Sequence, residues 1–355
     1  MVHFESKGIS SISLIIKLSL TLGCLYLMVQ RDSYQIFDRS PISAVTIKVK
    51  QGSYCSRNSS IVRYFPQYNC TKSLFDVNDF ILPATENSAV SITTRMVEIE
   101  HILKECHSSK YVSTAHQCYH RSRCILHPFY RAEYDSKQIS IKQDLCWFLS
   151  PHPTIRWNYE ALDYIIFIKH FIEFPQLGLI RHNLQSNVVT KNYLNTCEYH
   201  RYEHPLCPKF RILKILEMVE SNPANYKSML FHGSLIEIQI SWKCNLDRPI
   251  KYCEPIYAFH RLDIQPYESN PYDPGSNFFT SKHFFRPNDQ QLHRIHTEIY
   301  KLHIIVSVTG EAGRFDLFQT TTSIGSFLGI IGTGAIVCDI LASSLSNFKR
   351  VKYDK

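Results

Sequence analysis

The chain has 355 residues, 44% of them hydrophobic and 20% charged, and a formal net charge of +8. A chain of this length and composition can bury a core in one large folded domain, or two small ones, with appendages. The Lys and Arg residues are scattered and no motif that reads nucleic acid accompanies them, so the basic excess favours a small anionic ligand or a membrane surface.

The first apolar segment runs from Ile9 to Val29 and is interrupted only by Lys17. At about 1.5 Å per residue it is long enough to cross a hydrocarbon core of roughly 30 Å. A cleaved signal peptide is the alternative, but no small-residue cleavage site follows before Gln30. We therefore predict a cytosolic N-terminus at residues 1–8 and a transmembrane helix at 9–29.

The segment after this helix begins with a strand pattern. Residues 44–52 alternate so that Thr46, Lys48 and Lys50 share one face. The two lysine side chains then lie about 6.6 Å apart, a spacing that suits a polyphosphate. A solvated sheet face is the alternative for such a pair when it stands alone.

Further runs rich in β-branched and aromatic residues predict a β-rich domain without internal repeats. The predicted strands lie at 162–168, 234–242, 257–263 and 299–309. The best helical candidate is 210–220, and residues 53–72 and 264–293 have the composition of loops or insertions.

Cysteines, and to a small extent sequons, support placing residues 30–321 outside the cytosol. Ten of the twelve cysteines fall in this region, and an even set in an extracellular domain indicates disulfides, although spacing alone leaves the pairing open. Asn58 and Asn69 begin glycosylation sequons. A zinc site at 116–120 (HQCYH) with Cys124 is the weaker alternative to disulfides, so we expect no metal. No P-loop, GxSxG or HExxH motif occurs, and we expect no enzyme activity.

The second long apolar segment, 322–345, carries a single acid, Asp339. Basic residues precede the first span (Lys7) and follow the second (Lys349), which predicts that both ends, including a tail at 346–355, are cytosolic. A carboxylate in a span normally faces a bundle interior or water. Helix packing with Asp339 near the interface is the alternative to a pore. One helical stripe contains Thr322, Gly325, Gly329, Gly332, Ile336, Asp339 and Ser343.

Several motifs together resemble the ATP-gated purinoceptor channels, in that family's order and over nearly the whole chain. They are VTIKVK (45–50), DFILPATENS (79–88), HPLCPKFR (204–211), ISWKCNLD (240–247), RLD (261–263), GEAGRFD (310–316) and IGSFLGIIGTGAIVCDI (324–340). The resemblance implies a homotrimeric or heterotrimeric cation channel in the plasma membrane or an internal membrane. Each ectodomain would be a β-sandwich body with appended lobes, including a head-like lobe at about 100–150. Extracellular ATP would bind between neighbouring subunits as a ligand, and no cofactor is implied.

The resemblance also implies particular residues for the pore and the disulfides. The pore helix would present Gly325, Ser326, Gly329, Gly332 and Asp339. The implied disulfides are Cys197–Cys207, Cys244–Cys253 and Cys106–Cys146, with Cys118–Cys124 in a reduced head lobe and Cys55–Cys70 in an insertion that the family pattern lacks.

The nucleotide site matches the family pattern only in part. Lys48 and Lys50 match its two phosphate-binding lysines, and Asn277 with Phe278 match the start of its Asn-Phe-Arg motif. The departures are Phe279 in place of the arginine, Glu298 in place of the last phosphate-binding lysine, and Ile165 in place of the threonine that contacts adenine.

These substitutions remove two cations and add one anion opposite a ligand of charge about −4, which weakens or alters the ATP response. The chain could act as a channel with weak or altered nucleotide sensitivity. It could instead be an accessory subunit whose lysines complete a site with a conventional neighbour. A third alternative is a non-conducting, membrane-tethered ectodomain for binding or adhesion.

Overall fold

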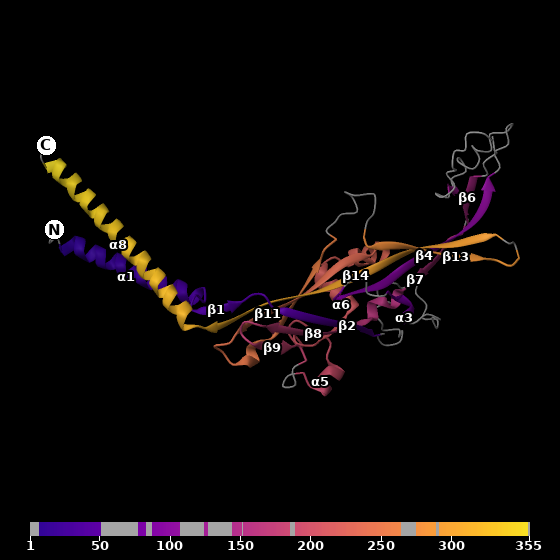
Figure 1. Ribbon diagram of the computed structural model, residues 1–355, viewed down its shortest axis with the longest axis horizontal. Helices are drawn as coiled ribbons and strands as arrows, with labels where there is room; N and C mark the ends of the chain where they lie inside the picture. The colour runs from indigo at the N-terminus through magenta and orange to yellow at the C-terminus, as the bar shows by residue number, and fades with distance from the viewer. Residues whose placement is uncertain are drawn as a thin grey trace, which may run out of the picture.

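The structure is a computed structural model that describes residues 7–50, 77–82, 87–106, 124–126, 144–150, 152–184, 189–263, 275–288 and 291–353. The protein is elongated, with two long helices at one end and a β-rich body that extends away from them (Figure 1). The long helices are α1 (Lys7–Gln30) and α8 (Leu317–Tyr353). Both termini lie at the same end of this helical pair, as the predicted orientation requires (Figure 1).

The larger sheet has ten strands and runs along the length of the body. Its main path is β12 (Pro255–Arg261), β11 (Ser234–Asn245), β14 (Leu292–Phe315), β4 (Ala89–Cys106), β6 (Asp144–Leu149) and β5 (Cys124–Leu126). Four strands attach beside this path: β1 (Gln35–Asp38) and β13 (Asn277–Phe285) pair with β14, and β3 (Ile81–Leu82) and β7 (Thr154–Trp157) pair with β4. β14 is the central strand, because it pairs with β1, β4, β11 and β13.

The smaller sheet has four strands. It consists of β10 (Lys209–Arg211), β8 (Ile165–Phe174) and β2 (Ile42–Lys50), with β9 (Leu179–His182) paired to β8. Alternate residues of β8 are buried, and so are alternate residues of β11 in the larger sheet. These inward side chains belong to one hydrophobic cluster, which contains Ile166, Ile168, Ile172, Ile236, Ile238, Ile240 and Trp242. The two sheets therefore share one core, as in a sandwich.

A buried polar contact crosses this core between the two sheets. The Trp242 indole Nε1 donates a hydrogen bond to His170 Nε2 at 3.0 Å, and both side chains are fully buried. Burial, followed by the charge of His182, lowers the pKa of His170 to about 4, so this imidazole is neutral at physiological pH. A neutral ring satisfies the indole without placing a charge in the core.

The remaining helices are short and lie beside the sheets. They are α3 (Val77–Phe80), α5 (Lys191–Thr196), α6 (Ile212–Val219), α7 (Pro223–His232) and the 3-10 helices η2 (Tyr159–Asp163) and η3 (Ile250–Tyr252). α6 confirms the helix predicted at 210–220, and its buried residues Ile212, Leu213, Ile215 and Leu216 join the core.

Each predicted strand overlaps a strand of the structure, but a strand in a polar part of the chain was not predicted. The interpretation of 264–293 as loops or insertions was wrong for 277–285, which form β13, and for the start of β14 at Leu292. β13 ends just before Pro287 and Asn288 and β14 begins just after them, and residues of this kind are typical of loops. The first residues of the strand predicted at 162–168 belong to η2, and β8 begins at Ile165.

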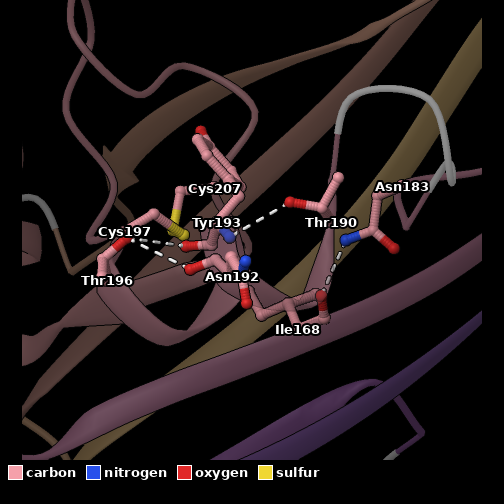
Figure 2. Close-up of a disulfide and its surroundings, with 8 residues drawn as sticks. All are labelled: Ile168, Asn183, Thr190, Asn192, Tyr193, Thr196, Cys197 and Cys207. Carbon is pink, nitrogen blue, oxygen red and sulfur yellow. Dashed lines mark hydrogen bonds between the residues drawn. A yellow bond between two sulfur atoms is a disulfide. The ribbon is translucent and has the colours of Figure 1, made fainter.

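Two disulfides lie within the described part of the chain, and both are pairs that the resemblance implies: Cys197–Cys207 and Cys244–Cys253. Figure 2 shows how the first closes the lobe that contains α5. Thr190 caps this helix by accepting a hydrogen bond from the Tyr193 backbone N–H, and the Cys197 N–H bonds to the Tyr193 carbonyl at its end. The lobe is thus fixed at both ends of a six-residue helix that would be unstable alone.

Other predicted features lie outside the described residues. These are Asn58, Asn69, the Cys55–Cys70 pair, Cys118 and the HQCYH segment at 116–120. The side chains of Cys106, Cys146 and Asp339 are likewise outside the description, although their backbones belong to β4, β6 and α8.

Candidate functional site

Lys48 and Lys50 lie where the strand pattern predicted them, on the outer face of β2. Both side chains are exposed, whereas Val45, Ile47 and Val49 on the opposite face are half-buried and pack against the core. Within the described residues, neither lysine forms an ion pair. Two neighbouring ammonium groups without a carboxylate between them attract anions.

The pairing of β2 with β8 extends this cationic surface. Lys50 lies opposite Ile165, Lys48 opposite Phe167, and Thr46 opposite Lys169. Phe167 has a lysine on each side, because it pairs with Lys48 of β2 and with Lys209 of β10. We call the group formed by Lys48, Lys50, Lys169 and Lys209 the lysine face. Ile165 therefore lies directly beside Lys50, and Ile165 and Phe167 give this face an apolar centre.

Arg211, a further cation beside this face, is neutralised by carboxylates of its own chain. Arg211 pairs with Ile165 across β10 and β8. Its guanidinium donates two hydrogen bonds to Glu198, at 2.9 and 2.8 Å, and lies 3.5 Å from Asp163. The hydrogen bonds to Glu198 raise the pKa of Arg211. Arg211 thus joins β10 to the segment that follows α5, whereas the four lysines of the lysine face form no ion pair within the described part of the chain.

Sequence reasoning missed Lys169 and Lys209 as members of this face. Lys169 follows the strand predicted at 162–168 by one residue, and it continues the outward alternation of Ile165 and Phe167. That alternation could have identified Lys169. Lys209 could not have been found in this way, because β10 has only three residues and its register is a tertiary contact.

The facing half of the predicted site lies on β13 and β14 of the larger sheet. Asn277 pairs with Tyr300, Phe278 with Ile299, and Phe279 with Glu298. Phe279 and Glu298, the two predicted departures on this half of the site, are therefore direct neighbours on one face of the sheet. Asn277 shares that face, two residues before Phe279, and Phe278 points to the opposite one.

Glu298 is the anion of this half. Its carboxylate accepts a hydrogen bond from the Tyr300 hydroxyl. Phe279 is 56% exposed and stacks on His296, with ring centroids 5.5 Å apart. We call Phe279, His296, Glu298 and Tyr300 the glutamate patch. Lys301 does not belong to it, because its ammonium lies 5.4 Å from the Phe278 ring on the opposite face.

Histidines continue the same sheet face beyond the glutamate patch. The His101 and His296 rings have centroids 5.7 Å apart, and Arg294 donates to His101 Nδ1 at 3.3 Å. Burial, then the charges of Arg294 and His296, lowers the pKa of His101 to about 4. Burial, then the charge of Arg294, also lowers the pKa of His296, against the opposing effect of Glu298. Both rings are therefore neutral near pH 7, and Glu298 remains the dominant charge of the glutamate patch.

Asn277 is positioned by a close approach between the end of α7 and the start of β13. Gly233 ends α7 and Gly275 precedes β13, with φ of 78° and 88°. The Ser276 N–H donates to the His232 carbonyl, and the Ser276 carbonyl accepts from the Lys301 N–H, each at 3.0 Å. A Cβ on Gly233 would lie 2.1 Å from the Ser276 oxygen. Glycine is thus required for this packing.

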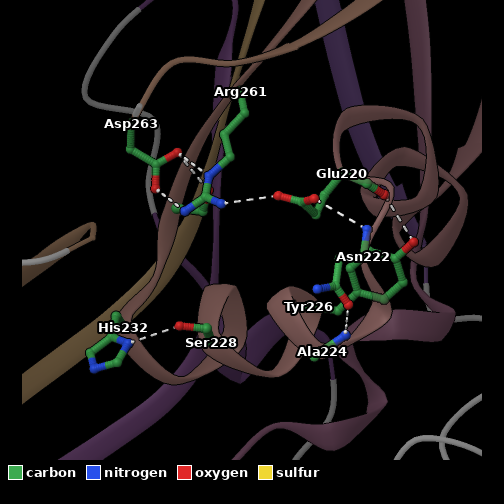
Figure 3. Close-up of polar contacts among 9 residues, drawn as sticks. Glu220, Asn222, Ala224, Tyr226, Ser228, His232, Arg261 and Asp263 are labelled. Atoms are coloured by element: carbon green, nitrogen blue, oxygen red, sulfur yellow. Dashed lines mark hydrogen bonds and ion pairs between the residues drawn. The ribbon is translucent and has the colours of Figure 1, made fainter. Parts of the chain in front are cut away.

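Polar contacts hold α7 itself in place (Figure 3). Arg261, at the end of β12, lies 3.5 Å from Glu220 and 2.9 Å from Asp263, which also accepts from Ser234. Asn222 caps the helix by accepting from the Ala224 N–H at 3.0 Å. The RLD motif therefore has a structural role: it ties β12 to the turn between α6 and α7.

The predicted pore residues lie on α8. Gly325, Ser326, Gly329 and Gly332 are exposed in the single chain, and a Cβ on any of the three glycines would meet no atom within 4 Å. Within the residues whose side chains the structure describes, Leu317–Val337 has the length and apolar character of a membrane span, and Leu18–Gln30 of α1 is a shorter apolar helical segment. α1 and α8 approach each other where a Cβ on Gly334 would lie 3.1 Å from Leu20.

Comparison with known proteins identifies the family. A family model described as ATP P2X receptor matches residues 1–138 and 150–355. The chain is 28% identical over 336 residues to P2X purinoceptor 4 of Bos taurus, covering 89% of this chain and 80% of that protein. It is 26% identical over 359 residues to P2X purinoceptor 5 of Mus musculus, covering 95% and 73%.

Solved structures show the same fold. An invertebrate P2X receptor from the Gulf Coast tick, determined with ATP and Zn²⁺, superposes with a TM-score of 0.65 at 23% identity, covering 93% of this chain and 99% of that one. The family resemblance drawn from the motifs is thereby confirmed, and with it the β-rich, disulfide-bonded fold. The chain belongs to the ATP P2X receptor family.

Proposed function

We propose that the chain is a subunit of a trimeric cation channel in the plasma membrane, opened by an extracellular nucleotide. The observation that carries this proposal is the lysine face, where Lys48 and Lys50 are exposed and unpaired within the described residues. The nucleotide would lie between the lysine face of one subunit and β13 of its neighbour. Ile165 and Phe167 would contact the base, since apolar side chains bind a ring without a hydrogen bond.

The departures on the facing half set the strength of the response. A hydrogen bond to a charged group contributes about 1.5 to 3 kcal/mol, so the absence of two cationic donors costs at least about 3 kcal/mol. This corresponds to roughly a hundredfold in affinity. Glu298 adds repulsion against the phosphates. We expect a homotrimer to respond to ATP at much higher concentrations than a subunit with the full family pattern.

The two long helices support the membrane part of the proposal. Leu317–Val337 of α8 would form the pore-lining span, and its exposed glycines would allow three copies to approach closely. α1 would form the second span and would contact α8 near Gly334. The hydrogen bond from Ser323 Oγ to the Ser33 carbonyl, at 2.7 Å, connects α8 to the turn that follows α1.

Whole-cell recording from the full chain tests this function. We expect a cation current that requires ATP well above micromolar concentration and is reduced at least tenfold in sensitivity by Lys50→Ala. The control is Lys243→Ala, because Lys243 is also an exposed strand lysine but lies on β11. A current insensitive to Lys50→Ala would contradict the site, and the absence of any current would contradict a homomeric channel.

A second candidate function follows from the asymmetry between the two halves. Because the lysine face keeps both phosphate-binding lysines and the opposite half has Phe279 and Glu298, the chain could supply only the lysines to a site completed by a conventional neighbour. Co-expression with such a subunit should then give ATP currents that fall with Lys50→Ala and not with Asn277→Ala. Failure of the two chains to associate would exclude this role.

A further inference from the structure

Glu298 is a carboxylate held in a fixed position. The Tyr300 hydroxyl donates to it, and the Tyr300 ring lies 3.9 Å from the guanidinium carbon of Arg95. Arg95 is only 7% exposed, and it also lies 3.8 Å from the Phe231 ring and 5.4 Å from the Trp157 ring. A guanidinium enclosed by three aromatic rings has few alternative positions. It therefore fixes the tyrosine, and through it the carboxylate.

The surroundings of Glu298 suit an incoming ammonium group. Phe279, directly across the strand pair, exposes an aromatic ring beside the carboxylate. A carboxylate provides an ion pair for an ammonium, and an adjacent ring face adds a cation–π contact. Within the described part of the chain, Glu298 forms no ion pair, so this arrangement is not used by a cation of its own subunit.

The complementary charge is on the other sheet of the same chain. Lys48 and Lys50 project from β2 in the four-stranded sheet, whereas Glu298 lies on β14 in the ten-stranded sheet. In the proposed assembly, the two lysines of one subunit and Glu298 of its neighbour lie on opposite sides of one cleft. Each of these charges is without an ion-pair partner among the described residues of its own chain. Opposite charges placed across an interface attract each other whether or not a ligand is present.

We propose that Glu298 of one subunit forms an ion pair with Lys48 or Lys50 of its neighbour, so that protein charges occupy the cleft and a polyphosphate must displace the carboxylate to bind. This inference rests on the proposed function, because the pair exists only in that assembly. The partner is a second copy of this chain. The pair makes the subunit contact partly ionic and makes an anionic ligand a competitor of Glu298.

The test uses the full-length chain in detergent, with labelled ATP as the probe and chemical cross-linking to count subunits. Glu298→Gln should raise the affinity for labelled ATP about tenfold, because it removes the competing carboxylate without adding a cation. Lys50→Glu should lower the temperature at which cross-linked trimers disappear. The double variant Lys50→Glu/Glu298→Lys should restore that temperature, because the charges are exchanged. The same substitutions at Glu311 are the control, since Glu311 lies on β14 beside an exposed Arg39.

The possible outcomes separate this inference from the function on which it rests. One outcome is that trimers form and bind ATP through Lys50, but the exchanged charges do not restore trimer stability and Glu298→Gln does not raise the affinity for ATP. In that case the ion pair is refuted and the channel proposal stands. If cross-linking finds only single chains, both are refuted. An equal rise in affinity with Glu311→Gln would show a general effect of net charge and would also overturn the ion pair.

Discussion

The contact between Gly233 and the start of β13 gives the sharpest prediction of stability. We expect Gly233→Ala to destabilise the ectodomain by about 3 kcal/mol or more. A non-glycine residue at the φ of 78° and ψ of 171° of Gly233 costs roughly 1 to 3 kcal/mol. The new Cβ would in addition lie 2.1 Å from the Ser276 oxygen and 2.6 Å from the Lys301 oxygen, both of them backbone atoms that cannot rotate away. The backbone must therefore move, and the 3.0 Å hydrogen bond from Lys301 to Ser276 is lost at about 1 kcal/mol.

Gly178→Ala is the matched control for this prediction. Gly178 also has a positive φ, 61°, but no atom lies within 4 Å of its Cβ position. It should therefore show only the conformational cost of about 1 to 2 kcal/mol. Urea unfolding of the purified full chain, followed by tryptophan fluorescence, measures both variants. If the two variants are equally stable within about 0.5 kcal/mol, the close approach that positions Asn277 does not exist as described.

Two further predictions concern pH and the first disulfide. The pKa of His170 is about 4 in the folded protein and about 6.5 in the unfolded chain. Between these pH values the unfolded chain binds more protons, so the stability of the folded protein falls as pH falls. The loss from pH 7 to pH 5 is about 2 kcal/mol. His170→Gln should flatten this dependence in urea titrations at the two pH values, and an unchanged slope would rule out His170 as its source. The double variant Cys197→Ser/Cys207→Ser should lose about 3 kcal/mol through the entropy of the opened loop. Equal stability of this variant and the unmodified protein, measured in the same titration, would show that the α5 lobe is held by Arg211 and its capping bonds alone.

Alternation of residues was sufficient to predict part of the lysine face. On a two-residue period, Lys48 and Lys50 must share a face and Val45, Ile47 and Val49 must share the other, so burial of the apolar set exposes the lysines. β11 was predicted for the same reason, since its apolar residues alternate without interruption from Ile236 to Trp242. Local patterns of this kind are independent of the rest of the chain.

β13 could not be predicted because its signal depends on its partner. The sequence of β13, NFFTSKHFF, mixes polar and aromatic residues without a regular alternation. The segments before and after it in the sequence are rich in Pro, Asn and Asp. It forms a strand because β14 supplies backbone partners along its full length. β14 itself, at 24 residues, was predicted only where its sequence is most apolar. The strand that carries Asn277 and Phe279 therefore forms through its pairing with β14, which its own sequence does not reveal.

The sequence by itself determined the family, the two apolar ends and the disulfide-bonded β domain, and it predicted the departures at Phe279 and Glu298, because motifs and periodicities are carried by neighbouring residues. Only the tertiary structure decided that Lys169 and Lys209 join Lys48 and Lys50, since strand register places them together. It also decided that Phe279 and Glu298 are neighbours, and that Arg95 and Tyr300 hold the carboxylate. These contacts join residues up to about two hundred positions apart, and the free energy that selects them comes from burying the shared core.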